Sequence, residues 1–343
     1  MPYRIQWQRM DGIQFSGFWC CRHNVVESVG QTPCRCFAAN QLVWRGRRSR
    51  MWLAIWLAFI KNRVKQLFHG EPVDRYAVFG NPIGHSKSPL IHSWFAKQTA
   101  QALSYEAILA PVHAFADSWF SFVAAGGRGG NVTVPFKEQA YQLAEQLSER
   151  AFQAGAVNTL YIDKAGVLCG DNTDGLGLVA DLTRLGALLQ DAAILVLGAG
   201  GACRGVVGPL LAAGVKHIHI ANRTAAKAEA IAGLFDNRVT ASGYDEVPAE
   251  KWSLVINATS SGLEQQRPAL AEQHLKHCTL AYDMLYGKEP TAFLIWCQQQ
   301  GVPHCADGLG MLVSQAAESF AIWRGVKPDV TPVLQQLTAM VKA

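Results

Sequence analysis

The sequence lacks the features that would place it in a membrane or an oxidising compartment. Its apolar run Met51–Ile60 covers ten residues, whereas a helix that spans a bilayer needs about 20. Its nine cysteines include no C-x2-C pair of the kind that binds structural zinc. Most cysteines beyond residue 73 lie within apolar patterns, where a free thiol acts as a small hydrophobic group. We therefore predict a cytoplasmic protein without a transmembrane span, a disulfide framework or a metal site.

Basic charge is scarce in most of the chain, although the net charge is +5. Residues 1–73 hold eleven Lys and Arg against three acidic residues, whereas residues 74–343 hold 20 against 23. The larger part lacks the basic face that nucleic-acid binding requires, so we predict no nucleic-acid partner. At 343 residues the chain is long enough for two domains, because single cores stop growing at about 250–300 residues.

The first 73 residues mix Trp, Cys and Arg, without a sustained period up to residue 50, and we expect them to be poorly ordered. In 51–68, apolar residues fit one face of a helix that basic residues flank, a pattern compatible with an amphipathic helix at a membrane surface. The alternative is that residues 1–73 are upstream sequence translated from an early start codon.

The stretch Gly127–Lys137, GRGGNVTVPFK, sets a lysine where helix electrostatics disfavour one. Asn131–Val134 reads as a short strand, and Pro135 suits the first position of a helix whose third residue is Lys137. A cation at the positive end of an exposed helix costs about 0.3–1 kcal/mol. The side chain is either an ordinary surface lysine or part of a site.

A carboxylate follows in the motif GDNTDG. Asp174 is either the N-cap of a helix predicted over Gly175–Leu188 or the partner of a functional group. Ser86 and Ser88 stand at the entrance of a helix predicted over Leu90–Thr99, where two hydroxyls and free backbone N–H groups suit a carboxylate ligand. Ordinary helix capping would need only one of the two serines.

A short apolar run, Ala193–Leu197, leads directly into GAGGACRG at Gly198–Gly205. The run is typical of a strand buried on both faces of a parallel sheet, and the N-terminus of the following helix suits a pyrophosphate. Cys203 replaces the third glycine of the G-x-G-x-x-G pattern, so the motif depends on this strand–helix context.

The residues after the next predicted strand indicate which dinucleotide binds. An NAD-binding protein places Asp or Glu there, whereas Arg223, Thr224 and Lys227 offer positive charge and donors to a 2′-phosphate. This pattern favours NADP(H). The alternative is a helix start that Thr224 caps and from which Lys227 extends into solvent.

These motifs, with GNPIGHSKSPL at Gly80–Leu90, AGAVNTL at Ala154–Leu160 and NATSSG at Asn257–Gly262, resemble shikimate dehydrogenases, in the same order and over about Tyr76–Leu337. The resemblance implies an α/β fold with two domains. It implies an N-terminal α/β substrate domain with a mostly parallel sheet, a Rossmann NADP-binding domain, and C-terminal helices that return to the first domain.

The implied domain boundaries are 74–173 with 309–343 for the substrate domain and 174–308 for the NADP-binding domain. The implied activity is the reversible NADPH-dependent reduction of 3-dehydroshikimate to shikimate, an oxidoreductase step of chorismate and aromatic amino acid biosynthesis. A carboxylate beside Lys137 favours the charged lysine, which suits an acid in reduction and hinders a base in oxidation, so the route of the proton stays open.

The resemblance also implies a role for each residue of the site. The catalytic residues would be Lys137, which stabilises or protonates the developing alkoxide, and Asp174, which orients the ammonium. The substrate-binding residues would be Ser86, Ser88, Thr133, Asn158, Tyr286 and Gln315. The cofactor-binding residues would be Glu149, Gly198, Ala199, Gly200, Gly201, Ala202, Asn222, Arg223, Thr224, Lys227, Met284 and Gly308. Read without the resemblance, Glu149 is an exposed residue at a helix start, and Met284 and Tyr286 are core residues.

Two other functions fit the same fold. One is a quinate or shikimate dehydrogenase that uses NAD, which the charge pattern at Arg223 disfavours. The other is a ligand-binding regulator without catalysis, which the presence of both Lys137 and Asp174 disfavours. We expect a monomer or a homodimer.

Overall fold

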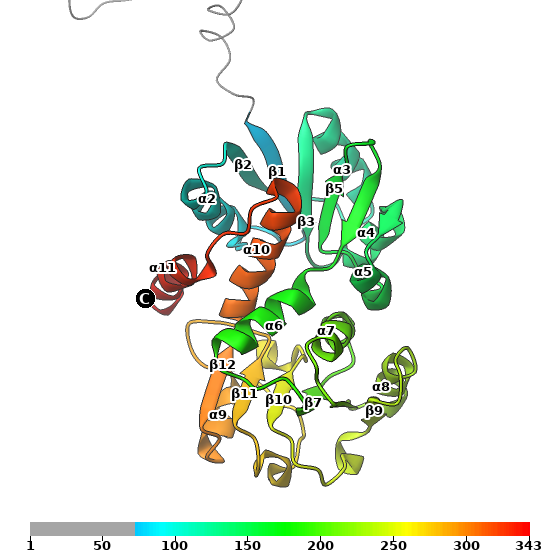
Figure 1. The fold of residues 1–343 in the computed structure, drawn as a ribbon, viewed down its shortest axis with the longest axis vertical. Helices are drawn as coiled ribbons and strands as arrows, with labels where there is room; N and C mark the ends of the chain where they lie inside the picture. The colour runs from blue at the N-terminus through cyan, green and yellow to red at the C-terminus, as the bar shows by residue number, and fades with distance from the viewer. Residues whose placement is uncertain (1–72) are drawn as a thin grey trace, which may run out of the picture. The chain divides into compact units, whose positions relative to one another are not determined.

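The computed structural model describes residues 73–343 (Figure 1). The expectations for the preceding leader, including the helix at 51–68, lie outside the described residues. Within 73–343, no helix is both long and apolar enough to cross a membrane. The same residues contain no cluster of three or more His, Cys, Asp or Glu side chains that could hold a metal ion.

The N-terminal sheet is mixed, and its strands lie in the order β2-β1-β3-β5-β6-β4. The strands are β1 (Asp74–Gly80), β2 (Leu103–Leu109), β3 (Gly127–Val132), β4 (Gln146–Leu147), β5 (Thr159–Ile162) and β6 (Leu168–Asp171). β1 runs parallel to β2 and β3, and β4 runs parallel to β6, but β5 is antiparallel to both of its neighbours. A tight turn after β5 makes β5 and β6 an antiparallel hairpin, and in it Asp163 Oδ1 accepts hydrogen bonds from the backbone N–H groups of Ala165 and Val167.

Helices cover both faces of this sheet. They are α2 (Ser88–Gln98), α3 (Phe115–Ala124), α4 (Lys137–Leu143) and α5 (Glu149–Ala154). One core contains Phe79, Trp119 and Phe136, all fully buried. A second core joins α2 to the C-terminal helices through Phe95 and Phe320. The entrance to α2 and the start of α4 are therefore fixed by separate cores.

The second sheet is entirely parallel, in the order β12-β11-β10-β7-β8-β9. Its strands are β7 (Ala193–Leu197), β8 (His217–Ala221), β9 (Val239–Ser242), β10 (Leu254–Asn257), β11 (Leu280–Asp283) and β12 (His304–Asp307), and its α-helices are α7 (Gly201–Ala212), α8 (Ala225–Ala232) and α9 (Ala292–Gln299). In chain order the strands follow the arrangement 3-2-1-4-5-6 of a dinucleotide-binding fold. The predicted Rossmann sheet is confirmed, and β7, the predicted all-apolar strand, lies at its centre.

Two long helices connect the sheets. α6 (Asp174–Arg184) leaves the N-terminal sheet, and α10 (Leu309–Arg324) leaves the Rossmann sheet and packs along α6 (Figure 1). The helices cross closely, because a Cβ atom at Gly177 would lie 2.7 Å from the backbone nitrogen of Gln315. α10 and α11 (Val330–Lys342) also pack against α2. The predicted return of the C-terminal helices to the first sheet is confirmed, and the exact domain boundaries remain a prediction.

Three helices begin at positions other than those predicted. α2 begins at Ser88 and not at Leu90. α4 begins at Lys137 and not at Pro135, because residues 133–136 form a turn in which the Phe136 N–H donates to the Thr133 carbonyl over 2.9 Å. α6 begins at Asp174 itself, with Thr173 as its N-cap. Lys137 and Asp174 are therefore each the first residue of a helix. Of the two interpretations of Asp174, the helix N-cap does not apply, because Thr173 occupies that position.

Candidate active site

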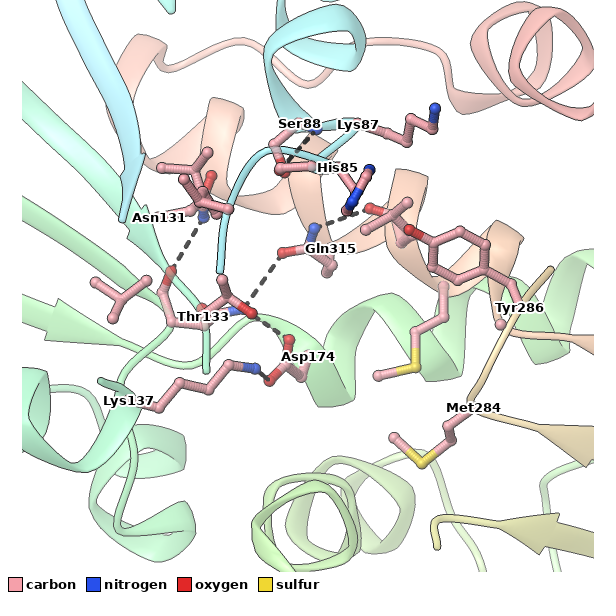
Figure 2. Close-up of a pocket in the computed structure, with 18 of the residues that line it drawn as sticks. His85, Lys87, Ser88, Asn131, Thr133, Lys137, Asp174, Met284, Tyr286 and Gln315 are labelled. Atoms are coloured by element: carbon pink, nitrogen blue, oxygen red, sulfur yellow. Dashed lines mark hydrogen bonds and ion pairs between the residues drawn. The ribbon is translucent and has the colours of Figure 1, made fainter. Parts of the chain in front are cut away.

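A pocket of about 400 Å³ opens where the N-terminal sheet meets α6, α10 and the loop after β11. Its lining includes the loop between β1 and α2, the end of β3, the starts of α4 and α6, the loop that follows β11, and the first half of α10 (Figure 2). The predicted site residues that line it are Ser86, Ser88, Thr133, Lys137, Asn158, Asp174, Met284, Tyr286, Gly308 and Gln315. All predicted catalytic and substrate-binding residues are therefore brought together.

Lys137 and Asp174 form an ion pair at the wall of this pocket (Figure 2). Lys137 Nζ lies 2.5 Å from Asp174 Oδ2, and the two side chains are 30% and 17% exposed. The two residues lie 37 positions apart in the chain. The Val157 N–H donates to the Lys137 carbonyl, which ties the start of α4 to the segment before β5. The lysine ammonium is thus held in place while one side of it remains accessible from the pocket.

Asn158 holds the other oxygen of the carboxylate. Its Nδ2 donates to Asp174 Oδ1 over 2.8 Å and lies 3.3 Å from Gln315 Oε1. The orientation of this amide is determined, because Asn158 Oδ1 accepts the backbone N–H of Thr173 at 2.9 Å and a backbone N–H can only donate. Both carboxylate oxygens of Asp174 therefore have a fixed donor, one charged and one neutral.

Ser86 and Ser88 line the pocket at the start of α2, where Figure 2 labels Ser88. α2 begins at Ser88, and Ser86 Oγ accepts the Ser88 N–H over 3.3 Å, which is a weak contact. Lys87 is the N-cap and makes no side-chain capping hydrogen bond. Capping thus engages one serine weakly, and both hydroxyls line the pocket beside a helix N-terminus.

Tyr286 and Met284 come from the loop after β11 on the opposite side of the pocket (Figure 2). Burial, followed by the charge of Asp307, raises the pKa of the Tyr286 hydroxyl. The phenol therefore stays protonated at neutral pH and can donate a hydrogen bond. β11, which precedes both residues, is tied to α6, because the buried Tyr282 hydroxyl donates to Asp181 Oδ2 over 2.7 Å.

The predicted pyrophosphate loop lies between β7 and α7. Gly198 has a φ of +101°, a conformation that favours glycine, and a Cβ there would lie 2.8 Å from Thr259. A Cβ at Gly200 or Gly201 would meet no atom within 4 Å, so there is open space in front of the first turn of α7. Cys203 is fully buried, and burial raises the pKa of its thiol to about 12. It acts as a small packing residue in place of the third glycine.

The predicted 2′-phosphate residues lie in the turn after β8 and at the start of α8, outside the pocket. Arg223, Thr224 and Lys227 are exposed beyond β8, and none of the ion pairs found within residues 73–343 involves Arg223 or Lys227. Asn222 Nδ2 donates to the Thr224 carbonyl and shapes this turn. The loop of Gly198–Ala202 and this turn follow adjacent parallel strands, so they face the same edge of the sheet.

Glu149 lies apart from both groups. It is the exposed first residue of α5, and its Oε1 accepts a hydrogen bond from Gln153 at the next turn of the helix. α5 itself packs against α7, so Glu149 is near the nucleotide-binding helix without lining the pocket.

Several pocket residues did not appear in the prediction. Asn131 is the most informative of them, because it lies two residues before Thr133, and alternate residues of a strand face the same side. That spacing could have indicated it. The other residues that line the pocket unpredicted are Val78, Pro82, Ile83, His85, Lys87, Val132, Met311 and Leu312.

The fold and the site together define a class of protein: an α/β enzyme with a dinucleotide-binding sheet beside a pocket that holds a lysine–carboxylate pair. Three family models match the chain. Residues 78–160 match the shikimate dehydrogenase substrate binding domain, residues 182–284 match shikimate/quinate 5-dehydrogenase, and residues 308–338 match the shikimate 5′-dehydrogenase C-terminal domain. The chain belongs to the shikimate dehydrogenase family.

Individual relatives agree with this. A shikimate dehydrogenase (NADP(+)) of Shewanella halifaxensis is 54% identical over 266 residues, which cover 77% of this chain and 95% of the relative. Among solved structures, the Ael1 enzyme of Pseudomonas putida has a TM-score of 0.75 at 45% identity, covering 77% of this chain and 98% of the other. The shikimate 5-dehydrogenase of Thermus thermophilus, in complex with NADP(H) and shikimate, has a TM-score of 0.70 at 34% identity and covers 78% and 99%.

Proposed function

We propose that this protein catalyses the reversible NADPH-dependent reduction of 3-dehydroshikimate to shikimate, a step of chorismate and aromatic amino acid biosynthesis. The observation that carries the proposal is the Lys137–Asp174 ion pair, which lies in one pocket with two serines at a helix N-terminus. The family membership and the named activity of its relatives support it.

The substrate carries a carboxylate, a ring carbonyl and hydroxyls, and the pocket offers a partner for each. Ser86 and Ser88 would hold the carboxylate with their hydroxyls and with the free N–H groups of the first turn of α2. Thr133, Asn158 and Gln315 would contact the ring hydroxyls, and the protonated Tyr286 phenol would add a further donor. These contacts would fix the ring so that its carbonyl faces the lysine.

Lys137 would act on the carbonyl oxygen. When the carbonyl is reduced, negative charge develops on that oxygen, and an ammonium placed beforehand stabilises it more than water does. Asp174 holds the ammonium at 2.5 Å and Asn158 holds Asp174, so the lysine need not reorganise during the reaction. In reduction Lys137 can donate a proton to the oxygen. In the reverse direction the ion pair opposes proton uptake, so we leave the route of that proton open.

The residues of the Rossmann sheet fit NADP(H). Gly198–Ala202 and the N–H groups at the start of α7 would hold the pyrophosphate, for which the open space at Gly200 and Gly201 leaves room. Asn222, Arg223, Thr224 and Lys227 would hold the adenosine 2′-phosphate. Met284 and Gly308 line the pocket and would contact the nicotinamide, which supplies the hydride. Glu149 stays a weaker candidate for the cofactor site.

The proposal extends to the organisation of the protein. The substrate domain would comprise 74–173 and 309–343, and the NADP-binding domain 174–308. We further propose a cytoplasmic monomer or homodimer with a small-molecule substrate and no nucleic-acid partner.

A direct assay tests the activity. Purified protein is mixed with shikimate and either NADP+ or NAD+, and formation of reduced nicotinamide is followed by absorbance. We expect turnover with NADP+ and shikimate, and much less with NAD+ or with quinate. Preferred turnover of quinate with NAD+ would establish the rival dehydrogenase. Shikimate binding without turnover with any of these combinations would establish a binding protein.

A further inference from the structure

A buried cluster of hydroxyl and amide side chains lies directly behind the pocket. Ser319 of α10, Thr159 of β5 and Thr173 before α6 are all fully buried, and Asn131 is 6% exposed. Ser319 Oγ is the centre of the cluster: it lies 2.9 Å from Asn131 Nδ2, 2.8 Å from Thr159 Oγ1 and 3.1 Å from Thr173 Oγ1. It also lies 3.1 Å from the Gln315 carbonyl oxygen one turn earlier.

Asn131 Nδ2 faces the Asn158 carbonyl at 3.1 Å, and a carbonyl only accepts, so this end of the Asn131 amide is the donor. The other end, Oδ1, accepts the Tyr105 hydroxyl over 2.7 Å. Ser319 therefore accepts from Asn131, and its own proton goes to Gln315 or to a threonine. The hydroxyl of Ser319 has one proton and two lone pairs, and four polar atoms lie within hydrogen-bond distance of it.

The cluster ends on the amide that holds the catalytic carboxylate. Thr159 Oγ1 donates to Asn158 Oδ1 over 2.7 Å, on the side of the amide opposite the Asp174 contact. Without an acceptor or donor at Ser319, the hydroxyls of Thr159 and Thr173 are free to rotate away from Asn158. The amide would then keep fewer of the contacts that fix its rotation, and Asp174 would lose part of the support for its second oxygen.

We propose that Ser319 is a positioning residue for the reaction. It does not line the pocket, and it acts through Thr159, Thr173 and Asn158 on the Lys137–Asp174 pair. This inference rests on the proposed function, because its effect is measured as turnover of shikimate. It explains why a polar side chain occupies a fully buried position on α10, where an alanine would suit the surrounding helix packing.

The test compares Ser319→Ala with a matched control, Ser314→Ala. Ser314 lies on the same helix, is 3% exposed, and its side chain makes none of the hydrogen bonds found among residues 73–343. We expect Ser319→Ala to lower kcat about tenfold, to change KM for shikimate less than about threefold and to leave KM for NADP+ unchanged, since a small misplacement of reacting groups costs rate more than binding. Ser314→Ala should keep the wild-type kcat.

A double-mutant cycle decides whether the effect passes through Asn158. In an Asn158→Ala background, the further change Ser319→Ala should cost less than about twofold. An equal loss with and without Asn158, or a lowered melting temperature with unchanged kcat, would overturn the inference and leave Ser319 a structural residue. If Ser319→Ala does not fold, Thr159→Val removes the donor to Asn158 through which Ser319 acts, and it must show the same loss of kcat. A wild-type protein without turnover would instead refute the proposed function, which separates the two failures.

Discussion

His92 makes the stability of the N-terminal part depend on pH in a way that can be calculated. The side chain is fully buried, its ring stacks on Tyr105 with the ring centres 4.2 Å apart, and neither ring nitrogen has a hydrogen-bond partner. Burial lowers the pKa of His92 to about 3, against about 6.5 in an unfolded chain. Because the folded form binds fewer protons, stability is complete above the unfolded value and is lost as the pH falls toward the folded one.

Between pH 7 and pH 5 this one residue should therefore lower the free energy of unfolding by about 2 kcal/mol. The assay is urea denaturation of the wild type and of His92→Phe at both pH values. Phenylalanine keeps an aromatic ring against Tyr105 and cannot be protonated. We expect the wild type to lose about 2 kcal/mol more than the variant over this range, and His113→Gln, a change at an exposed histidine, to behave as the wild type. Urea denaturation resolves differences of about 0.5 kcal/mol. If the free energy of unfolding falls by the same amount in the wild type and in His92→Phe within that precision, protonation of His92 does not control the pH dependence.

Three further outcomes follow from the site. Lys137→Ala should lower kcat by about 10²–10⁴ while weakening shikimate binding less, and near-normal turnover in steady-state kinetics would exclude its role on the developing charge. Arg223→Ala should raise KM for NADP+ by the equivalent of about 1.5–3 kcal/mol and leave KM for NAD+ nearly unchanged; equal changes for both would make it a structural residue. A variant that begins at Asp74 should turn over shikimate as the full chain does, because the proposed site lies between Ser86 and Gln315, whereas aggregation or lost activity would show that the leader is part of the folded enzyme.

Local sequence determined the parts of this protein that depend on near neighbours. The run Ala193–Leu197 followed by a glycine-rich turn could form little else than a buried parallel strand and a helix start, because its apolar residues and the φ of Gly198 leave few alternatives. The dinucleotide-binding sheet follows from that pattern. The preference for NADP(H) could likewise be predicted from local sequence, because the turn after the second strand of this fold faces the adenosine ribose and holds Arg223 in place of an acidic residue.

The tertiary structure decided how the site residues are used. Asp174 looked equally like a helix cap, and only the tertiary structure, which places the first residues of α4 and α6 next to each other, brings Lys137 to within 2.5 Å of it. Gln315 reaches Asn158 because Gly177 lets α10 cross α6 closely, a contact between residues 138 positions apart. The start of α4 was misplaced by two residues because the turn at 133–136 is held by tertiary contacts, among them the bond from Thr133 to the Phe79 carbonyl. Periodicity and capping signals act over a few residues, whereas these arrangements depend on long-range packing. The sequence therefore indicated which residues form the candidate site, and only the tertiary structure determined their geometry.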